Sequence, residues 1–232
     1  MKQKNFVLNA LILIVIMSIP VSAKITSNYV YLGAGVCRLA KEIQIPGENN
    51  AWVVQTDTQS GLYPNIGAGY YDKWGDFRLE FDVSYRKNSI ANVEIIDMNV
   101  IGISIQGGEG TVTSLSFMLN GWYDLDIIGS WMVYFGGGLG AGRLSLKEVY
   151  IQTAPVVPNP KVTRTLYVND SDWRFAVQAG AGITFALSDD FILDLGYRYY
   201  TTADPKFIAE MGNEFFADVQ SHTALISLKF LY

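Results

Sequence analysis

The sequence predicts an all-β protein, an up-and-down antiparallel β-barrel of eight strands that crosses a membrane. Three observations support this fold class. Apolar and polar residues alternate in repeated segments of about ten residues, as they do in the strands of transmembrane barrels. Short and long connections alternate between these segments. The last segment ends in an aromatic residue, Tyr232, and the alternate residues before it are apolar.

The composition fits the same fold class. Half of the 232 residues are hydrophobic and 17% are charged, an unusual balance for a water-soluble domain. After residue 23 no apolar run approaches the roughly 20 residues that a transmembrane helix needs. A transmembrane barrel accounts for both facts, because it turns an apolar face to lipid and keeps its interior polar.

Residues 1–23 have the features of a cleaved secretory signal peptide. Two lysines precede an apolar run, Phe6–Val21, and small residues follow up to Ala23. The alternative is an uncleaved membrane anchor, but the run is short and Pro20 interrupts it. We therefore expect one domain, an outer-membrane β-barrel of residues 24–232.

The clearest strand pattern lies in Asp76–Arg86. Apolar residues from Phe77 to Tyr85 alternate there with a face that is almost wholly charged. The same alternation, or a glycine-rich form of it, is found in Tyr29–Cys37, Tyr63–Tyr71, Ser114–Tyr123, Met132–Arg143, Trp173–Leu187, Phe191–Tyr199 and Thr223–Tyr232. Aromatic residues lie near the segment ends, as expected for girdles at the two lipid–water interfaces.

The connections indicate how the strands are oriented. Short turns are expected at Asp72–Asp76, Asp124–Ser130 and Ser188–Asp190. Longer connections are expected at residues 40–61, 87–111, 146–172 and 202–217. Outer-membrane barrels have short periplasmic turns and long external loops, so both chain ends should be periplasmic. The apolar stretch within 87–111 has two interpretations: strands that continue above the membrane, or a contact surface for a partner.

The C-terminal strand is predicted to be a recognition signal for the barrel-assembly machinery. Its lipid-facing residues are Ala224, Ile226, Leu228, Phe230 and Tyr232. It should pair with the first strand near Tyr29–Cys37, so that no backbone edge is left in lipid.

The string Asp194-Leu195-Gly196-Tyr197-Arg198-Tyr199, the glycine-rich fifth strand and the aromatic C-terminus resemble the opacity-protein and surface-antigen family of eight-stranded outer-membrane barrels. The resemblance covers nearly all of residues 24–232. It implies a protein of the bacterial outer membrane and, as in the family, a surface antigen, some members being adhesins.

The strand pattern turns a set of charged side chains into the barrel. An interior charge network is predicted from Arg78, Glu80, Asp82, Arg86, Arg174, Asp194, Arg198 and Lys229. Buried charges must be paired, so we expect a polar plug that fills the barrel. The alternative is a narrow conductance path lined by the same side chains.

Other chemistries are disfavoured. The single histidine, His222, lies near Asp218 and Ser221, but adjacent strand residues face opposite sides and His222 shares the lipid-facing phase. With one histidine and one cysteine, Cys37, no metal, cofactor or disulfide is expected, and no enzyme. Removing the signal leaves 15 basic and 22 acidic residues, a net charge of −7 that disfavours nucleic acid as a partner.

The function expected from the sequence is that of an outer-membrane surface protein. It would be a structural protein or surface antigen, or an adhesin that binds a host or surface ligand through its extracellular loops. The first alternative is a small porin-like channel for ions or solutes. A secreted soluble barrel of the lipocalin kind is the second, and the repeated apolar faces with aromatic ends disfavour it. The other expected partners are outer-membrane lipid and the assembly machinery.

Overall fold

The computed structural model describes residues 28–40, 43–46, 52–72, 76–98, 103–155, 164–208, 212 and 214–232. The predicted signal peptide lies outside these residues. Their secondary structure consists of twelve strands: β1 (Asn28–Leu39), β2 (Ile43–Pro46), β3 (Trp52–Thr58), β4 (Gly61–Tyr71), β5 (Phe77–Met98), β6 (Ile103–Ile128), β7 (Trp131–Pro155), β8 (Arg164–Ala186), β9 (Phe191–Thr202), β10 (Lys206–Ile208), β11 (Glu214–Phe216) and β12 (Gln220–Leu231). Among these described residues, no helix is long and apolar enough to cross a membrane.

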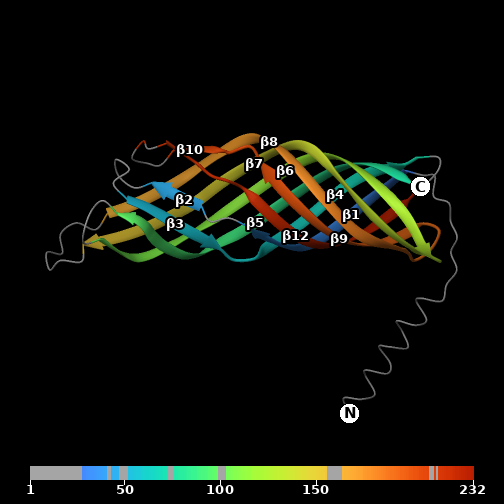
Figure 1. Cartoon of the computed structure of the whole chain (residues 1–232), viewed down its shortest axis with the longest axis horizontal. Helices are drawn as coiled ribbons and strands as arrows, with labels where there is room; N and C mark the ends of the chain where they lie inside the picture. The colour runs from blue at the N-terminus through green and yellow to red at the C-terminus, as the bar shows by residue number, and fades with distance from the viewer. Residues whose placement is uncertain are drawn as a thin grey trace, which may run out of the picture.

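Eight of the strands close into an antiparallel barrel (Figure 1), in the order β1-β4-β5-β6-β7-β8-β9-β12 and back to β1. The pairing of β1 with β12, in which Tyr29 faces Leu231, closes the barrel as predicted. The stagger of the strands follows from stepping from each residue to its paired residue on the next strand. A path that starts at Arg38 on β1 and goes first to His222 on β12 returns to β1 at Asn28, ten residues from its start. Eight strands with this stagger tilt by about 45° and enclose an interior that side chains can fill.

The prediction of short and long connections at opposite ends is confirmed. The start of β1 and the end of β12 lie at the same end of the barrel as the turns after β4, β6 and β8 (Figure 1). The prediction of long loops needs correction, because β5 to β8 have 22 to 26 residues each and continue beyond the membrane-spanning part. The first interpretation of residues 87–111, strands that extend above the membrane, is therefore the one that the structure supports.

The remaining four strands form two hairpins at the long-connection end. The β2–β3 hairpin joins the upper half of β5, where Thr58 faces Ile90 and Trp52 faces Met98. The β10–β11 hairpin is a separate two-stranded sheet. Residues 40–61 and 202–217 thus contain strands that the alternation in the sequence did not indicate, because these strands have only three to seven residues.

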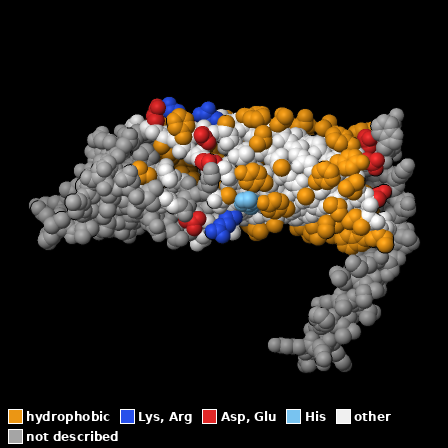
Figure 2. All heavy atoms as spheres, viewed as in Figure 1, with side chains coloured by type: hydrophobic (Ala, Val, Ile, Leu, Met, Phe, Trp, Pro, Cys, Tyr) orange, Lys and Arg blue, Asp and Glu red, His pale blue; other side chains and the backbone are white. Residues whose placement is uncertain are grey.

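The outer wall of the barrel is apolar. On β12 the residues of the predicted lipid-facing phase, from Ala224 to Tyr232, are exposed and those between them are buried. On the face in view in Figure 2, the apolar side chains gather over the part of the barrel near the short turns. Exposed aromatic residues mark both borders of this band: Tyr70, Phe77, Tyr123, Phe135, Phe191, Phe230 and Tyr232 near the short turns, and Phe117, Trp173, Phe175 and Tyr197 near the other end.

Candidate functional site

Among the described residues, eight charged side chains are buried in the interior of the barrel, each at most 3% exposed. The four cations are Arg78, Arg86, Arg198 and Lys229, and the four anions are Glu80, Asp82, Asp124 and Asp194. Their formal charges cancel. This balance matters because an unpaired charge in a low-dielectric interior costs several kcal/mol, about 3–5 when one partner of a pair is removed.

Glu80 on β5 lies at the centre of the network. Its carboxylate accepts hydrogen bonds from Tyr29 Oη at 2.9 Å and Tyr31 Oη at 3.1 Å, both on β1. It also pairs with Arg198 Nη2 on β9 at 3.3 Å and with Arg78 Nη1 at 3.6 Å. One side chain therefore ties together three strands that lie on different sides of the barrel wall.

Two further ion pairs lie towards the short-turn end. Lys229 Nζ on β12 is 2.6 Å from Asp194 Oδ2 on β9, and Tyr134 Oη donates to the other oxygen of that carboxylate at 2.8 Å. Arg78 Nε donates to Asp124 Oδ2 on β6 at 2.6 Å. Arg78 also lies over the Tyr134 ring, with 4.6 Å from its guanidinium carbon to the ring centroid.

Arg86 forms the upper layer of the network. Its guanidinium carbon is 3.9 Å from the centroid of the Tyr200 ring and 4.8 Å from that of Tyr63. Its Nη1 donates to Ser116 Oγ at 2.8 Å. Stacking of this kind can stabilise a buried guanidinium by roughly 2 kcal/mol or more when it is desolvated.

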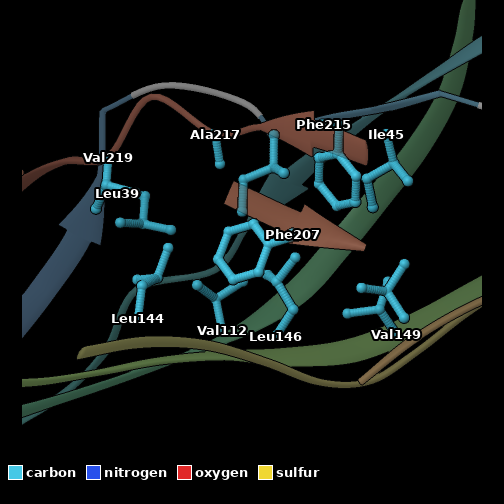
Figure 3. Close-up of a cluster of buried hydrophobic side chains, with 12 residues drawn as sticks. Leu39, Ile45, Val112, Leu144, Leu146, Val149, Phe207, Phe215, Ala217 and Val219 are labelled. Carbon is cyan, nitrogen blue, oxygen red and sulfur yellow. The ribbon is translucent and has the colours of Figure 1, made fainter. Parts of the chain in front are cut away.

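Above Arg86 the interior becomes apolar. The walls of the extended strands and the two hairpins enclose a cluster of buried apolar side chains, most of which Figure 3 shows: Leu39, Ile43, Ile45, Val112, Leu144, Leu146, Val149, Val168, Phe207, Phe215, Ala217 and Val219. Two carboxylates of β8 fasten the β10–β11 hairpin over this cluster. Asp172 accepts from the Lys206 amide at 2.8 Å and Asp170 from the Ile208 amide at 2.9 Å.

Seven of the eight residues predicted for the interior charge network lie in it, and Arg174 does not. Its side chain is 35% exposed and pairs with Asp172 at 2.6 Å. Arg174 has the inward phase of β8, but β8 begins to pair with β9 only at Ala176, so the side chain lies at the open upper rim and reaches water.

Asp124 and the interior aromatic residues belong to the network but are not among the residues predicted for it. The sequence predicts a turn at Asp124–Ser130, whereas β6 continues to Ile128. Asp124 has the parity of the inward residues Asn120 and Trp122, and that parity was the available signal. The buried rings of Tyr29, Tyr31, Tyr63, Tyr71, Trp122, Tyr134 and Tyr200 point inward, in phase with the charges. They fit because glycines such as Gly182 and Gly196, both beside Tyr134, leave room on other strands.

The residues considered for catalysis are separated. Ser221 is buried on the inward face of β12, whereas His222 is exposed on the outward face. His222 Nδ1 is 2.5 Å from Tyr197 Oη and packs against the Tyr199 ring, which fits a position at the membrane interface. Among the described residues, no group of three or more His, Cys, Asp or Glu side chains could hold a metal ion.

A closed antiparallel barrel with an apolar outer wall, aromatic borders and a charged interior defines an integral membrane protein of the outer-membrane type. Residues 10–230 match the family model described as "Outer membrane protein beta-barrel domain". The chain belongs to this family, and the bacterial outer membrane is its location. The expected membership among eight-stranded outer-membrane barrels is thereby confirmed.

Three known proteins illustrate the relationship. An uncharacterized protein of Brucella abortus is 37% identical over 82 residues, which are 35% of this chain and 28% of that protein. Outer membrane protein PagN of Salmonella typhimurium is 27% identical over 143 residues, 58% of this chain and 54% of PagN. The match thus spans about half or less of the length of these curated relatives. The crystal structure of Neisserial surface protein A superposes with a TM-score of 0.52 at 16% identity, covering 88% of this chain and 97% of that one, which shows a shared fold.

Proposed function

We propose that this protein is a surface protein of the opacity and surface-antigen type, which contacts a host or bacterial surface through its extracellular part. In this proposal the membrane barrel is a rigid anchor. The binding surface is formed by the extended upper halves of β5 to β8, by the connections between them and by the two hairpins. The observation that carries the proposal is the filled interior of the barrel, joined to strands that continue above the membrane.

The filled interior favours an anchor over the porin-like alternative. A path wide enough for water would leave its lining accessible to water. The side chains across the middle of the barrel, such as Arg78, Asp82, Asn120 and Trp122, have no accessible surface, and Glu80 has 1%. Above them the apolar cluster under the hairpins adds a second layer of buried side chains.

The extracellular part is well suited to recognition. Backbone pairing continues from the barrel into β6–β7 as far as Ile103 opposite Pro155, and into β7–β8 as far as Thr153 opposite Arg164. These paired strands fix the residues on either side of the connections 99–102 and 156–163, which themselves lie outside the described residues. Loops on a rigid scaffold are the usual location of binding residues.

Bacteria that display the full chain provide the test. We expect them to adhere to cultured epithelial cells, or to one another, at least tenfold more than bacteria with an empty vector. Replacing residues 99–102 and 156–163 with two-residue Asn-Gly turns should abolish the gain. The same replacement of Gly129-Ser130, at the opposite end of the barrel, should not. The proposal would be wrong if the full chain gave no gain on either surface, or if the external replacements left the gain intact at equal surface amounts.

A further inference from the structure

Arg86 differs from the other buried cations of the barrel. Arg78, Arg198 and Lys229 each lie within 3.3 Å of a carboxylate oxygen. Among the described residues no carboxylate pairs with Arg86, although Arg86 is only 2% exposed. A charge that is removed from water and left without a counter-charge is costly, so the surroundings of Arg86 require an explanation.

Asp82 balances Arg86 in number but does not contact it. Ser84 lies between the two residues on the inward face of β5. The Asp82 carboxylate has partners of its own, since its Oδ2 accepts from Tyr31 Oη at 2.6 Å and from Asn65 Nδ2 at 3.1 Å. The charges of the interior therefore cancel as a sum, but the positive charge of Arg86 is not compensated where it lies.

The donors in the layer of Arg86 lack acceptors among the described residues. Nε and Nη2 of Arg86 are buried and have no hydrogen-bond partner, and the same holds for Oγ of Ser114, which faces Arg86 across β5 and β6. The Tyr200 ring lies over the guanidinium, with 3.9 Å from the guanidinium carbon to the ring centroid. The hydroxyl of Tyr200 is buried and unpartnered, and so is that of Ser221, which faces Tyr200 across β9 and β12.

A cation and three hydroxyls from four strands thus lie in one layer. In folded proteins nearly all buried polar groups have a hydrogen-bond partner, so unpartnered donors indicate an ordered water or an ion. An ion is favoured at Arg86, because a negative charge supplies both the missing acceptor and the missing counter-charge.

We propose that Arg86, Ser114, Tyr200 and Ser221 form an internal binding site for a small monovalent anion, with chloride as the natural ligand. One negative charge matches one unpaired guanidinium, whereas a dianion such as sulfate would leave an excess charge. The interior is closely packed, which favours a single-atom anion over a larger one. A spherical anion also accepts hydrogen bonds from donors that arrive from different directions.

The anion would lie between two layers that are already described. Below it is the network around Glu80, and above it is the apolar cluster under the hairpins. An ion enclosed in this way would enter as the barrel forms and would stabilise the folded state. The site belongs to the membrane anchor, so it does not depend on surface recognition by the extracellular part.

Refolding the full chain into detergent micelles in two salts tests the proposal. At about 150 mM chloride, a site with a dissociation constant of about 10 mM favours the folded state about sixteenfold. The folded-to-unfolded ratio at a fixed urea concentration should therefore be about sixteenfold higher in sodium chloride than in sodium methanesulfonate at equal concentration, because the methanesulfonate anion is too large for the site.

Three variants separate binding at Arg86 from a general effect of salt. Arg86→Gln removes the cation, so the ratio should be the same in the two salts. Arg174→Gln is the matched control, because Arg174 is 35% exposed and pairs with Asp172, and it should keep the full chloride effect. Tyr200→Phe keeps the ring and removes the hydroxyl, which should weaken chloride binding about tenfold.

Crystals of the full chain grown in sodium bromide locate the ion directly through the anomalous scattering of bromine. We expect a bromine peak within hydrogen-bond distance of Nε and Nη2 of Arg86. A water at these atoms without a bromine peak would overturn the proposal. So would the absence of a chloride effect in the natural chain, or an equal effect in folded Arg86→Gln. If Arg86→Gln does not fold, the bromine peak and Tyr200→Phe decide, and an undiminished chloride effect in Tyr200→Phe counts against the site.

Discussion

Replacement of Glu80 by alanine is the sharpest perturbation of the barrel interior. It removes the acceptor for the Tyr29 hydroxyl, one of the two acceptors near the Tyr31 hydroxyl (the other is Asp82 Oδ2 at 2.6 Å), and one carboxylate from a set of four anions and four cations. The interior is left with one uncompensated positive charge, shared mainly by Arg198 and Arg78, which Glu80 contacts at 3.3 and 3.6 Å. Removing one partner of a buried pair costs about 3–5 kcal/mol, so we expect the free energy of unfolding to fall by that amount.

The assay is urea unfolding of the refolded full chain in detergent micelles, followed by tryptophan fluorescence. Glu214→Ala is the matched control, because Glu214 pairs with Lys206 at 2.7 Å while 55% of its side chain is exposed. An exposed pair of this kind contributes about 0–1 kcal/mol. Glu80→Gln should fall between the two, since it keeps an acceptor for the tyrosines but not the charge. If Glu80→Ala destabilises the protein no more than Glu214→Ala, the interior network does not stabilise the barrel.

Three other predictions follow from the same structure. Phe207→Ala removes a fully buried ring that packs 5.6 Å from Phe215, so amide exchange in β10 and β11 should accelerate at least tenfold while β9 and β12 stay protected; equal acceleration in all four strands would show that the hairpin is not a separate cap. Gly138→Val would place a branched side chain against Asn120 on β6 and should cost about 1–3 kcal/mol in urea unfolding, whereas Gly129→Asn, at a turn residue with φ 59° and open space, should be neutral; a neutral Gly138→Val would contradict the tight packing. Cys37 is 1% exposed, so maleimide should label it in urea but not in the folded barrel, and rapid labelling without urea would contradict its buried position.

The transmembrane part of the fold was predictable because its determinants are local. Alternation with a period of two residues fixes which side chains meet lipid, and in the segment around Phe77–Tyr85 it also identified the inward charges. The end of the chain was placed correctly for the same reason. Its apolar phase leaves Lys229 inside, where it pairs with Asp194.

The part above the membrane was not predictable in the same way. Once β5 to β8 leave the lipid, both of their faces can be covered by protein or water, and the alternation that marks a strand in the membrane is lost. The short strands of the two hairpins depend on contacts distant in sequence, such as Thr58 with Ile90. For the interior charge network, Arg174 shows what the sequence pattern could not predict. Its position in the alternation gave the inward direction of its side chain, but its exposure to water depends on where β9 ends.

The most direct test of the filled-anchor interpretation is planar-bilayer recording with the refolded, purified full chain. An interior that is filled by buried side chains whose described charges balance predicts no steady single-channel steps under an applied voltage. Reproducible steps of uniform size, abolished by heat denaturation of the sample, would contradict it and would support the porin-like alternative.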